Sequence, residues 1–362
     1  MRSRLSPTGS STPRRARGDP EPVGRLRVLV LVHETLVPPD SLEGVAEQAA
    51  AECRTEFDVV SCLRESGHDV RPIGIGDSLT ELRAAIQEWE PQACFNLLEE
   101  FGGIVTYDQH VVAYLELLRQ SYTGCNPRGM MLSRDKVLSK QILAYHRIPT
   151  PHFAVFRRGG AIRIPKALRY PLFVKSATED ASLGISQASV VEDAARLTER
   201  IGFIHEHTQS DALVEEYVEG RELYVGVLGN ERIRTLTPWE FIFGELKAGR
   251  SAIATRKAKW DRAYQERHGI TSGKAEGLPG GLAEKLDRLA RRVYRALHMT
   301  GYARIDFRVR DDGTPFVLEA NANPNLEREE DFSDAALHDD IAYPELLKRI
   351  VTLGRGYRAA WK

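Results

Sequence analysis

Short apolar runs alternate with amphipathic stretches over the first third of the chain. The runs have the composition of buried parallel strands and span residues 27–33, 69–75 and 93–98. The stretches between them show helical periodicity and span residues 42–65, 78–89 and 110–119. Ser78, with Glu81 three residues later, is the expected N-cap of the second helix. This βαβ alternation predicts an α/β domain in which helices cover a parallel sheet.

The rest of the chain mixes helices and strands in a different arrangement. Pro127 opens a predicted helix that ends near His146. Strands are expected at residues 153–156, 172–175, 188–191, 213–218, 222–228, 302–310 and 316–320, and helices at residues 192–206 and 282–298. The turn at residues 219–221 predicts a hairpin between strands 213–218 and 222–228. Residues 244–281 are polar and glycine-rich, which predicts a long loop that is functional or disordered.

Composition and charge narrow the class of protein. The 362 residues suit two or three domains, and 50 Lys and Arg against 51 Asp and Glu leave a formal charge of −1. This balance gives no global field for nucleic acid or an anionic membrane, and no stretch reaches the roughly 20 apolar residues of a membrane span. The four cysteines lack C-x-x-C spacing, so reduced thiols in a cytoplasmic protein are expected. The first 24 residues predict a disordered tail.

The strongest chemical signal lies on the two predicted strands near the C-terminus. Side chains alternate along residues 302–310, so Arg304 and Asp306 share a face, as do Glu319 and Asn321 on the partner strand. A hairpin brings the carboxylates and the amide together, and such oxygen ligands suit Mg²⁺. Arg304 is suited to a phosphate or a developing oxyanion. The alternative is a solvated charged face, against which an Asn within a strand argues.

Two separated lysines form a second signal. Lys136 lies early in a helix, and Lys175 ends an apolar strand, where an ammonium is well placed to meet a phosphate. Residues 178–185 follow, and Gly184 with its small neighbours lets backbone N–H groups approach phosphate oxygens. Taken singly, each feature also fits an ordinary surface lysine or loop. The acidic segment 213–223 likewise allows two interpretations. It either contacts a nucleotide or forms an amphipathic hairpin whose acidic side chains are solvated.

A series of short motifs follows in a specific order along residues 93–325. They are Ser121-Tyr-Thr-Gly124, Asp135-Lys136, Lys140-Gln141, Pro149-Thr-Pro151, Pro171-Leu-Phe-Val-Lys175, Glu215-Glu-Tyr-Val-Glu-Gly-Arg-Glu222, Gly301-Tyr-Ala-Arg-Ile-Asp306 and Leu318-Glu-Ala-Asn321. In order and spacing the series resembles the D-alanine–D-alanine ligase family of ATP-grasp enzymes. The resemblance implies an ATP-grasp fold of class α/β, with α+β lobes and an N-terminal Rossmann-like parallel-sheet domain. The implied divisions are a tail at 1–24, the N-terminal domain at 25–126, a central lobe at 127–212, and a C-terminal lobe at 213–355 with a mobile loop at 244–281.

The resemblance also implies a nucleotide site. ATP phosphates would be bound by Lys136, Lys175, Ser182 and Gly184. Adenine and its hinge would be faced by Glu215, Glu216, Tyr217 and Val218, and the ribose by Glu222.

Metal and catalytic roles follow from the same resemblance. Two Mg²⁺ ions would be held by Asp306, Glu319 and Asn321. The catalytic candidates are Arg304, Lys259 and Ser182. Arg304 would steady an acyl phosphate and a tetrahedral intermediate, and Lys259 would lie on the loop that covers the site.

Several positions depart from the family pattern where amino-acid substrates would lie. Ala181 replaces the first serine of the phosphate loop, Trp260 replaces a tyrosine, and Asn321-Ala-Asn-Pro-Asn325 replaces Asn-Thr-x-Pro-Gly. Residues 32–35 and 95–103 stand where the family has a Gly-rich loop. Candidates there for holding a substrate amine are Glu34, Glu99 and Glu100, although each also fits an ordinary surface or capping residue. Activation by ATP is therefore expected to be intact, while D-alanine specificity stays open.

The predicted function is that of an ATP-dependent, ADP-forming carboxylate–amine ligase that acts on amino acids or short peptides through an acyl phosphate. A D-alanine–D-alanine ligase proper is one alternative. A non-catalytic nucleotide-binding module is the alternative from another class. The resemblance suggests a homodimer, and no nucleic-acid or membrane partner is expected.

Overall fold

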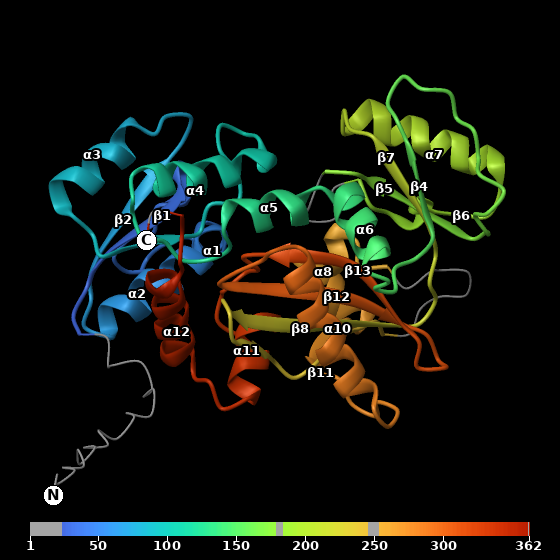
Figure 1. Ribbon diagram of the computed structural model, residues 1–362. Helices are drawn as coiled ribbons and strands as arrows, with labels where there is room; N and C mark the ends of the chain where they lie inside the picture. Colours follow the sequence, from blue (N-terminus) through green and yellow to red (C-terminus); the bar gives the residue numbers. More distant parts are fainter. Residues whose placement is uncertain (1–23, 179–183, 245–252, 361) are drawn as a thin grey trace, which may run out of the picture.

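The computed structural model describes residues 24–178, 184–244, 253–360 and 362, and its described strands form three sheets (Figure 1). The first sheet is parallel, in the order β2-β1-β3, and is built from β1 (Arg27–His33), β2 (Asp69–Ile75) and β3 (Ala93–Asn96). All three strands coincide with or fall within the predicted runs, because an uninterrupted apolar strand is stable only where both faces of a sheet are covered.

Helices cover both faces of the parallel sheet. They are α2 (Arg54–Glu65), α3 (Thr80–Trp89), α4 (Asp108–Leu117) and, from the C-terminus, α12 (Tyr343–Gly356), while the short helix α1 (Glu47–Glu52) precedes α2. One face packs Val28 and Val30 against Val59 of α2 and Ile350 of α12. The last helix of the chain therefore completes the core of the first domain, and Figure 1 shows α12 beside α2.

The second sheet is antiparallel and stands apart at the upper right of Figure 1. Its order is β4-β7-β5-β6, from β4 (Phe153–Phe156), β5 (Leu172–Ser176), β6 (Val190–Val191) and β7 (Ala212–Glu216). The helix α7 (Ala194–His207) packs Leu197 and Ile201 onto it. The chain reaches this lobe from the first sheet through two helices, α5 (Pro127–Arg134) and α6 (Lys136–Tyr145).

The third sheet is antiparallel and carries most of the candidate chemistry. Its order is β11-β10-β8-β12-β13, with β9 also on β8; the bounds are β8 (Arg221–Gly229), β9 (Ile233–Thr235), β10 (Trp239–Ile242), β11 (Thr271–Lys274), β12 (Tyr302–Val309) and β13 (Pro315–Ala322). One face packs on α10 (Leu282–Ala296) through Ile305, Phe307 and Val293. Its charged face is therefore left for the site. Shorter helices α8 (Arg256–Trp260), α9 (Arg262–His268) and α11 (Asp331–His338) follow its strands.

Two predicted helices are broken, and one predicted cap is wrong. The stretch 42–65 divides at Cys53 into α1 and α2, and the helix from Pro127 divides at Asp135 into α5 and α6. Asp135 takes an extended backbone and its side chain accepts a hydrogen bond from Leu138 N at 2.9 Å, so it caps the second helix. The N-cap of α3 is Leu79 rather than Ser78, whose hydroxyl instead accepts from Thr80 N at 3.2 Å.

The hairpin predicted across residues 219–221 is also wrong. β7 and β8 belong to different sheets, so the segment between them joins the two lobes. Gly220 has φ 139°, and a Cβ there would lie 2.0 Å from Val309 O, so only glycine fits this crossing. The long loop predicted at 244–281 contains α8, α9 and β11 in its described part, because Asp261 caps a short helix that the periodicity did not reveal.

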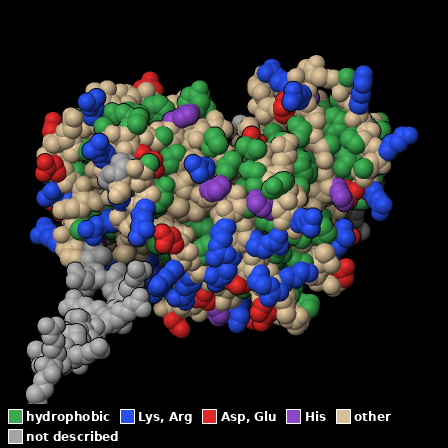
Figure 2. Space-filling model, viewed as in Figure 1, with side chains coloured by type: hydrophobic (Ala, Val, Ile, Leu, Met, Phe, Trp, Pro, Cys, Tyr) green, Lys and Arg blue, Asp and Glu red, His purple; other side chains and the backbone are tan. Residues whose placement is uncertain are grey.

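The surface is less uniform than a formal charge of −1 suggests. Figure 2 shows Lys and Arg gathered over the lower part of one face. On α10, Lys285, Arg288 and Arg292 are exposed at helical spacing, opposite the buried Leu286 and Leu289. No helix among the described residues has the length and apolar content to cross a membrane. The predicted tail, apart from Gly24, lies outside the described residues.

Candidate active site

The face of β12 and β13 turned away from α10 carries four polar side chains opposite one another. In the antiparallel register, Asp306 pairs with Glu319 and Arg304 pairs with Asn321. Directly opposed residues project to the same face, so the two carboxylates, the amide and the guanidinium form one group. A β-bulge follows between Asp306 and Phe307, which ends this register directly beyond the carboxylate pair.

Arg304 is held in place by the carboxylate two residues along its own strand. Its Nε and Nη2 donate to the two oxygens of Asp306 at 2.8 and 2.9 Å, a bidentate geometry. Its guanidinium also lies 4.4 Å from the ring centroid of Tyr224 on β8. Burial raises the pKa of Asp306, although Arg304 opposes that shift. The arginine is thus pre-oriented and needs no rearrangement to meet an anion.

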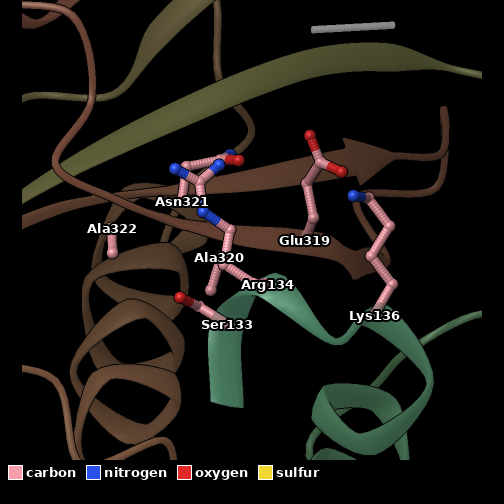
Figure 3. A pocket seen from close by; sticks show the side chains of 7 residues that line it. All are labelled: Ser133, Arg134, Lys136, Glu319, Ala320, Asn321 and Ala322. Carbon is pink, nitrogen blue, oxygen red and sulfur yellow. The ribbon is translucent and has the colours of Figure 1, made fainter. Parts of the chain in front are cut away.

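Glu319 lies among cations contributed by separate parts of the chain. Burial alone raises a carboxyl pKa, yet the ammonium groups of Lys175, Lys136 and Lys259 together hold the pKa of Glu319 below its ordinary value. Figure 3 shows the Lys136 amine and the Glu319 carboxylate directed into the same space. No hydrogen bond or ion pair to the Glu319 carboxylate is recorded in the described part of the chain, so an ionised oxygen pair remains available for a cation.

This donor set fits a hard divalent cation. Two carboxylates and one amide make a small set of protein ligands. Mg²⁺ prefers such a small set when it also binds phosphate oxygens. The Asn321 amide nitrogen is buried without a hydrogen-bond partner among the described residues, and the two ends of an amide are exchangeable, so its oxygen can take the ligand position. Across the described ranges, no group of three or more His, Cys, Asp or Glu side chains is placed to hold a metal ion by itself.

A buried triad lies beside the face that carries Asp306, Glu319 and Asn321, which is the predicted metal face. The Glu215 carboxylate on β7 pairs with Lys140 through one oxygen and with Lys175 through the other, the second at 2.9 Å. Lys140 also donates to Thr150 Oγ1 at 2.9 Å. Burial lowers the pKa of Lys140 to about 8, against the opposing charge of Glu215. Two ammonium groups share one carboxylate, so the triad holds a net positive charge that an anion can neutralise.

The predicted adenine and ribose residues lie at the crossing between the two lobes. Glu216 accepts a hydrogen bond from Arg169 N at 3.0 Å, and Tyr217 N donates to Pro171 O at 2.9 Å. Glu222 pairs with Arg308 at 2.9 Å and accepts from the Tyr224 hydroxyl at 2.9 Å. These contacts fix the crossing segment in one conformation.

The predicted covering segment (residues 244–281) and the predicted phosphate loop (residues 178–185) lie only partly within the described residues. Lys259 on α8 lies with its Nζ 5.9 Å from the Tyr224 ring centroid, and its charge acts on both Asp306 and Glu319. Ser182, with Ala181, lies outside the described residues. Gly184 is described with φ +72°, and its carbonyl accepts from Arg200.

A cleft of about 1100 Å³ joins these groups. Its lining includes the predicted Lys136, Lys175, Glu215, Glu216, Tyr217, Val218, Glu222, Lys259, Arg304, Asp306, Glu319 and Asn321. Gly184 and Glu34 do not line it, whereas Glu99 and Glu100 do. A volume of this size exceeds that of a typical small-molecule pocket and leaves room for a nucleotide and further substrates.

Sequence reasoning assigned no role to Lys140, Tyr224 or Glu56. Lys140 is one helical turn after Lys136, and that i, i+4 spacing was the available signal. Tyr224 and Glu56 line the cleft but carry no sequence signal, because an aromatic in a strand and an acid in a helix are ordinary.

Glu56 is expected to destabilise the folded state at neutral pH. Burial, with the nearby charges of Glu99 and Glu327, raises its pKa to about 7 from 4.5. A raised folded-state pKa means that protonated Glu56 is favoured on folding, so stability is lost as pH rises from 4.5 through 7. We expect Glu56→Gln to be up to about 3 kcal/mol more stable than wild type at pH 8, and near wild type at pH 4.5. Urea unfolding at both pH values measures this difference, and a pH-independent difference would contradict it.

Comparison with families and curated proteins gives a consistent result. The family model "D-ala D-ala ligase C-terminus" matches residues 142–352. A D-alanine–D-alanine ligase of Syntrophotalea carbinolica is 30% identical over 316 residues, which cover 85% of this chain and 92% of that protein. The uncharacterized protein y4sG of Sinorhizobium fredii is 33% identical over 302 residues, which cover 81% of this chain and 85% of that protein.

Solved structures share the fold at lower identity. A D-alanine–D-alanine ligase of Bacillus anthracis complexed with ATP matches with a TM-score of 0.71 at 22% identity, covering 92% of this chain and 97% of that one. The VanG D-Ala:D-Ser ligase of Enterococcus faecalis matches with a TM-score of 0.67 at 16% identity, and the match covers 91% of this chain and 100% of that one. The three sheets thus form the fold of these enzymes.

Proposed function

Because the chain belongs to the D-alanine–D-alanine ligase family and has the ATP-grasp fold, we propose that it is an ATP-dependent, ADP-forming carboxylate–amine ligase. One observation carries the proposal. A single cleft is lined both by the carboxylate pair Asp306 and Glu319 and by the lysines Lys136 and Lys175, from different lobes. A triphosphate with its counter-cations needs both signs of charge on opposite walls.

The nucleotide would lie between the two antiparallel sheets. Lys136 and Lys175 would bind phosphate oxygens, with Ser182 and Gly184 contributing the phosphate loop. The crossing segment Glu216–Val218 would face adenine, with Glu215 behind it, and Glu222 would face the ribose. The contacts that hold Glu215 and Glu222 support this placement because they keep the wall rigid before ATP arrives.

The metal proposal rests on the fit of the donor set described above. Asp306, Glu319 and Asn321 would hold two Mg²⁺ ions, which would neutralise charge on the transferring phosphoryl group. The Lys cluster around Glu319 keeps that carboxylate ionised across the neutral pH range, so it stays a competent ligand.

The chain's own residues account for the remaining chemistry. A substrate carboxylate would attack the γ-phosphorus of ATP, releasing ADP and giving an acyl phosphate. An amine would then attack the acyl carbon, and Arg304, already oriented by Asp306, would stabilise the oxyanion before phosphate leaves. Lys259 on the covering segment would shield the acyl phosphate from water and add positive charge at the phosphoryl group.

A D-alanine–D-alanine ligase proper is the second candidate, favoured by the names of several relatives. Against it stand Ala322 and Asn325, which replace the threonine and the glycine of the family pattern and line the cleft. A homodimer and a cytoplasmic location remain predictions.

The proposal is tested by ATP-dependent release of ADP and phosphate across a panel of amino-acid pairs, with D-alanine alone as one member. We expect a pair other than two D-alanines to give the largest kcat/KM, with equal amounts of ADP and amide product. Maximal turnover with D-alanine alone would favour the second candidate. Tight binding of ATP without ADP release from any pair would instead indicate a nucleotide-binding module.

A further inference from the structure

Arg200 on α7 is a buried cation that takes no part in the proposed reaction. It is only 7% exposed, and it projects from the helix that packs onto the second sheet. Its Nη2 donates to the carbonyl of Gly184 and, at 2.9 Å, to the hydroxyl of Ser189. The guanidinium also lies 4.3 Å from the ring centroid of Phe203. These contacts fix its position, and none of them supplies a negative charge.

No carboxylate balances the charge of Arg200 within the described residues. No ion pair of this side chain is recorded there, and its Nε is buried without a hydrogen-bond partner. Burial lowers the pKa of Arg200, with no acidic group of the described chain offsetting that shift. A guanidinium taken out of water without an anionic partner is costly. An anion that binds close by would reduce that cost, so the charge favours a negatively charged ligand.

One peptide unit separates the Arg200 contact from the cleft. Gly184 accepts from Arg200 through its carbonyl, and the next residue, Ile185, lines the cleft. Lys175 and Ser176, at the end of β5, line the cleft as well. Gly184 has φ +72°, which glycine adopts without strain, and its carbonyl faces Arg200 in that conformation. Arg200 is therefore connected to the wall of the cleft through the backbone of Gly184.

The turn that follows Gly184 is held by the same guanidinium. The Ser189 hydroxyl accepts from Arg200 and, at 3.1 Å, from the backbone N–H of Ser186. Ser189 N in turn donates to Ser186 O at 2.9 Å, which closes the short 3-10 helix η3 (Gln187–Ser189). Ser189 is fully buried, so water does not compete for these bonds. Arg200 thus binds both ends of the segment 184–189.

We propose that Arg200 is a positioning residue for the triphosphate: it holds Gly184 and Ile185 at the cleft and places a buried positive charge behind them. This inference rests on the proposed ATP site. Lys136 and Lys175 would meet phosphate oxygens directly, whereas Arg200 would act through the Gly184 peptide. A buried charge is screened less than a surface charge, so an anion in the cleft gains from it. A ligand without charge gains nothing.

The role of Arg200 predicts different effects on ATP and on adenosine, which has the same base and ribose but no phosphate. We expect Arg200→Gln to weaken ATP binding at least about tenfold and to leave adenosine binding within about twofold of wild type. Arg200→Lys keeps the charge but loses the planar pair of donors, so it should recover part of the ATP affinity. A residue that only supports packing would not separate the two ligands.

Calorimetric titrations of the full chain with ATP and with adenosine, in the presence of Mg²⁺, measure this difference. Arg196→Gln is the matched control, because Arg196 lies one turn earlier on α7, is exposed and pairs with Asp193 at 3.6 Å. It should bind both ligands like wild type. Ser189→Ala removes one partner of the guanidinium without changing any charge, and we expect it to weaken ATP binding less than Arg200→Gln does.

The same titrations separate this inference from the proposed function. Wild-type ATP affinity in Arg200→Gln, or an equal loss of ATP and adenosine affinity, would overturn the role of Arg200 and leave the ATP site standing. If Arg200→Gln does not fold, Arg200→Lys and Ser189→Ala decide: ATP affinity equal to wild type in both would overturn the role, and a loss confined to ATP would support it. Absence of ATP binding in wild type would instead remove the nucleotide site itself.

Discussion

Glu319→Gln should lower the rate of ADP release by about 10³-fold or more. The substitution keeps the shape of the side chain and removes the charge that lies among Lys136, Lys175 and Lys259. With a neutral amide there, these lysines lose their counter-charge and the metal face keeps a single carboxylate, Asp306. Neutralisation of the triphosphate by metal ions then fails on this face of the cleft. Steady-state ADP release at saturating ATP measures the effect.

Glu240→Gln is the matched control for this prediction. Glu240 lies on β10 of the same sheet, pairs with Arg221 and does not line the cleft. We expect this variant to lose some stability but to keep its turnover within about threefold of wild type. A partly exposed ion pair contributes little free energy and acts only on its immediate neighbours. Wild-type turnover in Glu319→Gln, or loss of turnover in Glu240→Gln as large as that in Glu319→Gln, would contradict the assigned metal face.

Glu215→Ala should destabilise the protein by about 3–5 kcal/mol and abolish ATP binding. The substitution leaves Lys140 and Lys175 buried with no opposing carboxylate. Burial already lowers the pKa of Lys140 to about 8, so one ammonium would lose its proton in the variant and the other would repel neighbouring cations. Urea unfolding gives the stability change, and calorimetry with ATP gives the loss of binding.

The double variant Glu215→Gln with Lys140→Met separates the loss of stability from the loss of ATP binding. Removing one charge of each sign should recover most of the stability while ATP affinity stays low, because Lys175 is no longer positioned by a carboxylate. If Glu215→Ala lies within about 0.5 kcal/mol of wild type, the triad carries no structural role and this account of the nucleotide wall is wrong.

The sequence predicts strands here better than it predicts their partners. β1, β2 and β4 have the predicted bounds, because apolar runs and alternation are local signals. The hairpin at residues 219–221 was wrong because strand pairing depends on distant residues: β8 pairs with β12, some 75 residues later. Helix breaks at Cys53 and Asp135 also escaped prediction, since a single non-helical residue does not disturb the apolar periodicity.

Part of the candidate site could likewise be predicted from the sequence, and part of it could not. Asp306, Glu319 and Asn321 could be placed on one face from side-chain alternation, because a hairpin connects their strands directly. The lysine partners of Glu215 could not, since α6, β5 and β7 meet only in the folded chain. The lining of the cleft likewise combines α2, the end of β3 and the loop after β13, and no local pattern joins them.

Titration of ATP by calorimetry with and without Mg²⁺ tests the central claim, that one cleft holds a triphosphate between lysines and a magnesium-binding carboxylate pair. We predict measurable binding of ATP that tightens at least tenfold with Mg²⁺ in wild type, with the Mg²⁺ effect lost in Glu319→Gln. Absence of ATP binding, or identical affinity with and without Mg²⁺, would contradict it.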